Sequence, residues 1–204
     1  MSIADQIARR AAELLLGGET SDMQKAIALA GEELGFARST WPGPVLVRRH
    51  ARAMAERDLG VEGHRALMHR RLRIAEEIMT LLETQLRPKE LWLVGRAAKG
   101  QLDADPVIRV RFHGDDPIGT IAAVLVEAGY EEPSFETLST RVGRLSSLRF
   151  NEGEVECVVV RCPPSQVSDS TIDLVTGGAV VRQSLESLRR ELASGDDQPM
   201  PPLS

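Results

Sequence analysis

A short segment of small and basic residues has the composition of an anion site. Gly95 and Gly100 leave room for the backbone to approach a phosphate group, and Arg96 and Lys99 lie between them and carry positive charge. This composition predicts a pocket for a phosphate-containing small molecule. The alternative is that these charges are simply exposed on a loop and a strand edge, where they also discourage edge pairing.

Two further arginines and one glutamate extend this candidate site. Residues 107–112 alternate in the way of a strand, which puts Arg109 and Arg111 on one face together with Val107. Glu156 lies in a second predicted strand, residues 154–161. If the two strands are neighbours, a guanidinium–carboxylate pair between Arg109 and Glu156 is expected.

Helices are expected in the first 87 residues. Ser2 is a predicted N-cap, with Asp5 three residues later as its capping-box partner. Apolar residues then recur at helical spacing, and glycine or proline interrupts the pattern between helices. The expected helices end at Gly17, at Gly35, at Gly60 and before Pro88, and Ser21 or Asp22 caps the second of them.

After residue 87 the sequence pattern becomes that of a mixed sheet flanked by helices. Strands are expected at 90–94, 107–112, 135–140, 145–150 and 154–161, and a short one at 172–175. Helices are expected at 116–128 and 179–193. The sequence therefore predicts an α+β protein with a helical module at 1–87, an α+β module at 88–195 and a disordered tail at 196–204.

The second module resembles the nucleotidyltransferase superfamily, which has the polymerase-β-like fold. Residues 91–95 match that family's first strand and its glycine, with Arg96 where the family has serine. The loop length then places Val107 and Arg109 at the two metal-binding aspartate positions. Glu156, in the strand expected at 154–161, matches the position of the third carboxylate. The resemblance implies a mixed sheet flanked by helices. In the family, these carboxylates hold two magnesium ions that bind a nucleoside triphosphate.

The departures from the family pattern bear on function. Valine cannot ligate magnesium, and an arginine would place a positive charge where the metal should lie. We therefore expect a degenerate member that is not an enzyme, has no cofactor, and has a binding or assembly role. The alternative is an active, divergent enzyme in which Asp103, Asp105 and Glu156 hold Mg²⁺ with a nucleoside triphosphate.

Composition excludes several other classes. The 204 residues carry 25 Lys and Arg against 30 Asp and Glu, and only two cysteines, so a disulfide scaffold is excluded. No apolar run approaches the ~20 residues of a membrane helix, and no signal segment is seen, which predicts a cytoplasmic protein without a membrane partner. The aromatic content of 3% argues against stacking on nucleic acid.

Three smaller features complete the expectations. Arginines concentrate in residues 48–73, but the chain is acidic overall, so we expect them to be solvated or to pair with acids elsewhere rather than to bind nucleic acid. Cys157 and Cys162 are expected to be packing residues and not metal ligands. A homodimer formed through an apolar patch on the first two helices remains an alternative role.

Overall fold

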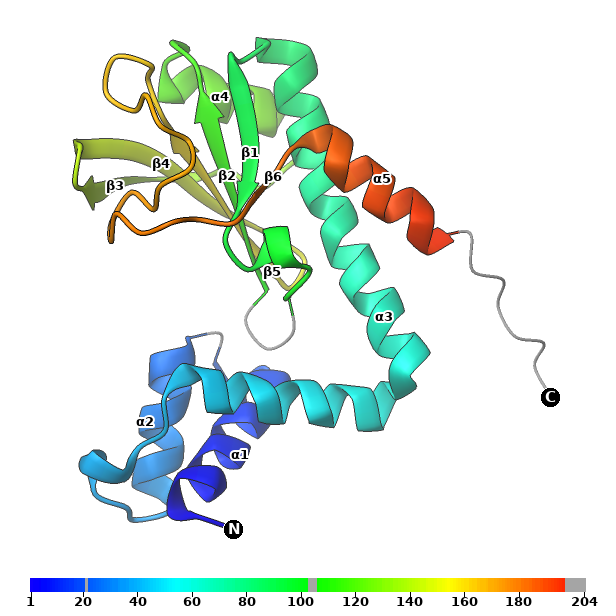
Figure 1. Cartoon of the computed structure of the whole chain (residues 1–204), viewed down its shortest axis with the longest axis vertical. Helices are drawn as coiled ribbons and strands as arrows, with labels where there is room; N and C mark the ends of the chain where they lie inside the picture. Colours follow the sequence, from blue (N-terminus) through cyan, green and yellow to red (C-terminus); the bar gives the residue numbers. More distant parts are fainter. Residues whose placement is uncertain (21, 103–105, 197–204) are drawn as a thin grey trace. The chain divides into compact units, whose positions relative to one another are not determined.

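The computed structural model describes residues 1–20, 22–102 and 106–196 (Figure 1). The chain divides into two compact units, Met1–Met68 with Leu102 in one and His69–Gln101 with the chain from Pro106 onward in the other. The expected boundary at residue 87 is the end of the long helix α3, whereas the units divide inside that helix. The later turns of α3 therefore belong with the sheet.

The first unit is helical. It contains α1 (Ile3–Leu16), α2 (Met23–Glu33), the short helix η1 (Arg38–Thr40) and the first part of α3 (Pro44–Leu86). The capping box is confirmed, because the Ser2 hydroxyl accepts from the Asp5 amide at 3.1 Å and the Asp5 carboxylate accepts from the Ser2 amide at 3.3 Å. Asp22 caps α2 by accepting from the amide of Lys25 at 2.8 Å.

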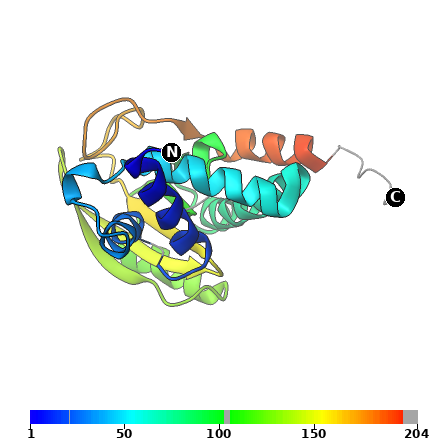
Figure 2. The same ribbon diagram turned by 90° about the horizontal axis from the view of Figure 1, so that it is seen from below.

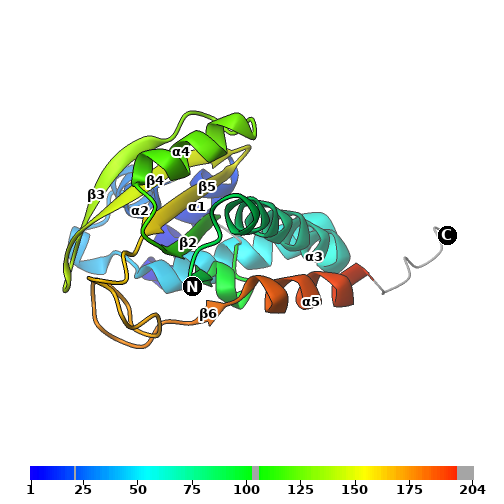
Figure 3. The same cartoon turned by 90° about the horizontal axis from the view of Figure 1, so that it is seen from above.

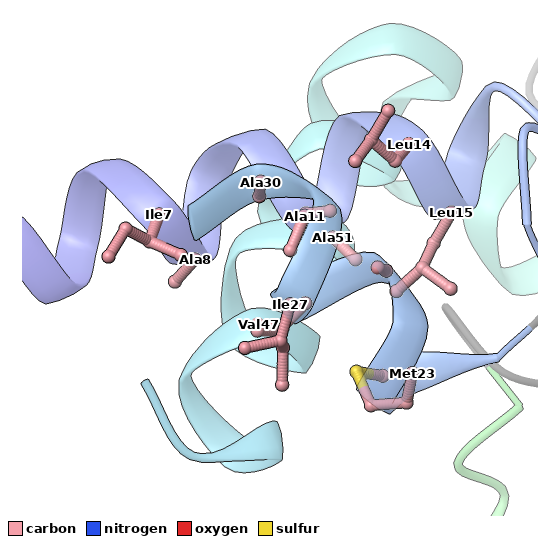
Figure 4. Close-up of a cluster of buried hydrophobic side chains, with 12 residues drawn as sticks. Ile7, Ala8, Ala11, Leu14, Leu15, Met23, Ile27, Ala30, Val47 and Ala51 are labelled. Carbon is pink, nitrogen blue, oxygen red and sulfur yellow. The ribbon is translucent and has the colours of Figure 1, made fainter. Parts of the chain in front are cut away.

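Small apolar residues let these helices pack closely. Figure 4 shows alanines of α1 and α2 facing larger side chains such as Ile7, Leu14 and Ile27. Gly31 on α2 has a stricter role, since a methyl group there would overlap the Trp41 indole. That indole donates to the carbonyl of Phe36 at 3.2 Å. Gly60 interrupts α3 with a φ of 70°, as expected for the end of one helix and the start of another.

The second unit is built on a six-stranded mixed sheet with the order β3-β4-β5-β2-β1-β6. β2 and β5 are parallel, and all other neighbours are antiparallel. The fold class is α+β. The strands are β1 (Glu90–Val94), β2 (Val107–His113), β3 (Ser134–Thr140), β4 (Gly143–Glu152), β5 (Val155–Arg161) and β6 (Arg182–Gln183).

The two faces of the sheet are covered differently (Figures 1 and 3). Helix α4 (Ile118–Glu127) lies on one face, here called the helix face. Residues 163–181, here called the strap, cross the opposite face, here called the strap face. Val167 and Leu174 of the strap are buried against Val107, Leu145 and Val160 of the sheet.

The last helix starts later than the sequence pattern predicts. Residues 182–183 form β6 beside β1, and α5 (Leu185–Asp196) begins only after Ser184, whose hydroxyl accepts from the amide of Ser187 at 3.2 Å. The β-branched pair Val180–Val181 favours the extended chain. The strand expected at 172–175 is reduced to one bridge between Ile172 and Ala179.

Helix α5 packs along the later turns of α3 (Figures 2 and 3). The Arg189 guanidinium lies 3.0 Å from the Glu76 carboxylate and also donates to the Thr80 hydroxyl at 2.8 Å. A ring nitrogen of His69 lies 2.9 Å from the carbonyl oxygen of Leu192. These contacts fix the helix that follows β6.

Candidate functional site

In the loop after β1, the amides of both glycines donate hydrogen bonds within the protein. Gly95, at a φ of 78°, donates to the carbonyl of Val181 at 2.9 Å. Gly100, at a φ of 65°, donates to the carbonyl of Ala97 at 2.9 Å and closes the short helix η2 (Ala97–Lys99). Both glycines are therefore explained by positive φ. In this conformation their amides are not available to a phosphate, so binding at this loop would depend on side chains and not on the two glycine amides.

Arg111 supports the strap instead of facing solvent. Only 4% of its surface is exposed. Its guanidinium donates to the carbonyl of Ile172 at 2.7 Å, and a longer contact of 3.5 Å reaches the carbonyl of Ser170. Burial lowers the pKa of this guanidinium. Arg111 shares a strand face with Arg109, as the alternation predicts, but the strap takes it out of reach of a ligand.

Arg109 lies in a row of side chains that crosses the sheet. Val94 on β1 is opposite both Arg109 and Arg182, and Val158 on β5 is opposite both Arg109 and Arg149. Directly opposite residues point to the same face, so all five side chains are on the strap face. We call Arg182, Arg109 and Arg149, with the two valines between them, the arginine row.

Of the arginine row, only its central member, Arg109, is predicted from the sequence as a site residue. Arg149 belongs to a strand that was expected, but its place beside Arg109 depends on the β4–β5 register, which alternation alone does not give. Arg182 fell in the predicted helix 179–193. The pairing of β6 with β1 is what brings it to the strap face.

Glu156 is paired with a different arginine from the expected one. Its carboxylate lies 2.5 Å from the Arg149 guanidinium, which also binds Glu136 at 2.8 Å. These two carboxylates, with Glu136 the stronger, raise the pKa of Arg149. In the sheet, Glu156 is opposite Val107 and Arg109 is opposite Val158. Two carboxylates therefore offset the charge at the Arg149 end of the row.

The other end of the row has an aromatic neighbour. The Arg182 guanidinium carbon lies 4.0 Å from the centroid of the Trp92 ring, and Arg182 also donates to the Ser170 hydroxyl. The indole of Trp92 donates to the Glu90 carboxylate at 2.8 Å, and this hydrogen bond lowers the pKa of Glu90. Stacking holds the Arg182 head group beside the sheet.

No cluster in the described ranges suits metal or nucleophilic chemistry. Among these residues there is no group of three His, Cys, Asp or Glu that could hold a metal ion. Asp103 and Asp105 lie outside the described residues. Cys157 and Cys162 are buried, and burial raises the pKa of each thiol to about 12, so neither is a thiolate at neutral pH.

A hollow on the helix face has the wrong charge for phosphate. It encloses about 330 Å³ and is lined by Glu77, Glu152 and Tyr130 together with Leu81, Ala128 and Gly129. Burial, with help from the two glutamates, raises the pKa of the Tyr130 hydroxyl to about 12. A phosphate placed there would face two carboxylates and no basic lining residue.

Several arginines in residues 48–73 pair with acids, in the way the net charge of the chain suggests. Ion pairs join Arg52 to Glu56 at 2.8 Å and Arg57 to Asp58 at 2.9 Å. In the sheet unit, the buried Arg71 lies 3.0 Å from Glu154. No helix in the part of the chain that the structure describes is long and apolar enough to cross a membrane.

Comparisons with known proteins give no relative from which a function could be transferred. No protein-family model, no curated protein and no solved structure matches this chain. The functional argument therefore depends on the geometry of the site.

Proposed function

We propose that this chain is a nucleotidyltransferase-like protein without metal catalysis that binds a phosphate-containing small molecule on the strap face. The observation that carries the proposal is the arginine row, which aligns three guanidinium groups on one face of the sheet. Guanidinium groups bind phosphate through charge-assisted and often bidentate hydrogen bonds.

The order and adjacency of the strands support the family part of the proposal. β1, the loop with Gly95, β2, α4 and β5 follow one another in the order that the resemblance requires. β5 lies directly beside β2, so Val107, Arg109 and Glu156 gather on one face. Two of these three metal-ligand positions carry side chains that cannot bind Mg²⁺, which favours binding over catalysis.

The centre of the site is the Arg109–Arg182 end of the row. Arg109 is exposed, and Arg182 is half-buried against Trp92. Arg96 and Lys99 lie two and five residues after Val94, the residue opposite both of these arginines. At the Arg149 end, Glu136 and Glu156 bind the guanidinium, which places two carboxylates beside any anion there.

Calorimetric titration tests this function. Purified protein is titrated with ATP and with inorganic triphosphate, first with Mg²⁺ and then with EDTA. We expect binding that does not need Mg²⁺ and that weakens about 10-fold or more in Arg109→Gln, since a hydrogen bond to a charged group contributes roughly 1.5–3 kcal/mol. Arg96→Ala should weaken it as well. Arg190→Gln is the matched control, because Arg190 is exposed on α5, away from the row.

The other outcomes decide between the competing functions. Binding that occurs only with Mg²⁺ would favour the enzyme alternative that uses Asp103 and Asp105. An absence of binding to either compound under both conditions would refute the anion site. Equal losses in Arg109→Gln and Arg190→Gln would show that only net charge matters.

A further inference from the structure

Among the described residues, no strand pairs with the outer edge of β3, and just beyond this strand the Arg141 amide donates to the Leu174 carbonyl of the strap at 2.9 Å. β3 is the first strand in the sheet order and pairs with β4 over all of its seven residues, from Ser134 to Thr140. Its side chains are exposed or half-buried, and Phe135 is 61% exposed. The opposite edge strand, β6, has only two residues.

The hydrogen-bond pattern shows which backbone groups of β3 point outward. Glu156 on β5 donates its amide hydrogen to the carbonyl of Pro106, on the side of β2, so even-numbered residues of β5 face β2 and odd-numbered ones face β4. The odd residues of β5 pair with even residues of β4, so the backbone groups of even β4 residues point to β5 and those of odd β4 residues point to β3. The odd residues of β4 pair with even residues of β3, so the backbone groups of even β3 residues point to β4. The outward amides and carbonyls of β3 are therefore those of Phe135, Thr137 and Ser139.

This edge lacks the usual protection against pairing. Exposed edges are commonly blocked by lysine, proline, a bulge or an inward-pointing charge. The sequence of β3 is SFETLST, with no lysine or proline, and its register with β4 is continuous, without a bulge. Its single charged residue, Glu136, is bound by Arg149 at 2.8 Å.

We propose that two copies of this chain associate through β3, in antiparallel register about a two-fold axis perpendicular to the sheet. Such an axis keeps the two faces continuous, so only residues of equal parity can be opposite each other. With Thr137 opposite its own copy, Phe135 is opposite Ser139 and Glu136 is opposite Leu138. The outward amides of each copy then donate to the outward carbonyls of the other.

Charge and length select this register and favour a second copy over an unrelated peptide. It pairs all seven residues and leaves no charged side chain directly opposite its copy. A shift that places Glu136 opposite Glu136 brings like charges together, which is destabilising. The strand is thus complementary to itself, and pairing also covers part of the exposed Phe135 ring. This dimer is independent of the anion site and differs from a dimer through the first two helices.

Sedimentation equilibrium of the full chain from about 1 µM to about 500 µM tests the proposal, because the dimer fraction follows mass action. We expect a monomer–dimer equilibrium for the wild type and a dissociation constant raised at least about 10-fold in Thr137→Pro. Proline is tolerated on an edge strand where its nitrogen faces solvent. Thr137→Lys provides a second variant that keeps the amide and places like charges opposite each other.

Two results would overturn the β3 dimer. One is a wild-type chain that stays monomeric over the whole concentration range. In that case an extended peptide would be the remaining candidate to pair with β3. The other is a dimer of unchanged affinity in both folded variants, which would place the interface elsewhere, as on α1 and α2. Hydrogen exchange adds a site-specific readout: the amides of Phe135, Thr137 and Ser139 should be slowed only in the concentrated wild type.

Discussion

Arg109 and Arg111 lie two residues apart on the same strand and point to the same face of the sheet, but their surroundings differ. Arg111 is buried, and its hydrogen bonds are to carbonyls of the strap. Arg109 is exposed between Val94 and Val158. One residue type on one strand is thus buried under the strap at position 111 and exposed at position 109.

The difference shows that strand alternation selects a face but does not determine what covers it. The strap comes from residues 163–181, far along the chain from β2. It places Val167 and Leu174 on the sheet and brings Ser170 and Ile172 over Arg111. Arg109 lies two residues from Arg111 on β2, in the arginine row. Stability is therefore expected to depend on Arg111 and its strap contacts, and ligand binding on the arginine row.

Replacing the two arginines by the same residue gives the largest expected contrast. Arg111→Gln removes a buried cation and leaves strap carbonyls without a donor, at a cost of about 2–4 kcal/mol in unfolding free energy. Arg109→Gln, on the exposed position, should change it by less than about 0.5 kcal/mol. Urea unfolding measures both. The comparison fails if the two variants unfold at the same urea concentration.

Acid should lower the unfolding free energy through His113, which lies beside the strap. His113 is buried beside the strap, and burial lowers its pKa, so it stays neutral in the folded chain where an unfolded histidine already takes up a proton. The unfolded state therefore binds more protons, and stability decreases as the pH falls below about 6.5. The groups that act on His113 are the backbone of Val167, the carboxylate of Glu90 and the guanidinium groups of Arg111 and Arg182.

The pH dependence can be assigned with a single substitution. In His113→Phe, the decrease in unfolding free energy just below pH 6.5 should become shallower, as urea unfolding at a series of pH values would show. Glu90, whose pKa is lowered mainly by the Trp92 indole, contributes stability that is lost only at lower pH, as the pH falls through its folded-state pKa. An identical pH profile in wild type and variant would show that His113 does not cause the loss of stability below pH 6.5.

Much of the fold follows from local sequence signals, whereas the site does not. The capping box at Ser2, the break at Gly60 and the five longer strands are visible in the sequence because each depends on neighbouring residues. Arg149 and Arg182 join Arg109 only through the pairing of strands that are distant in sequence. Local propensity also assigned 179–183 to a helix, although β1 recruits part of this segment into the sheet.

Replacing Glu156 gives the smallest expected effect on stability and affinity, and it tests whether the arginine row binds phosphate. Glu156→Gln weakens its pair with Arg149, which is half-buried and also bound to Glu136, so unfolding free energy should change by less than about 0.5 kcal/mol. If the row binds phosphate, removing one negative charge beside it should tighten triphosphate binding by about 2- to 5-fold at low salt, and the gain should shrink as salt is added. Calorimetry at two ionic strengths measures this change. Glu186→Gln on α5 removes the same charge away from the row and should leave the affinity unchanged. Equal gains in affinity in both variants would mean that the ligand responds to overall charge, and the arginine row would then not be a specific binding site.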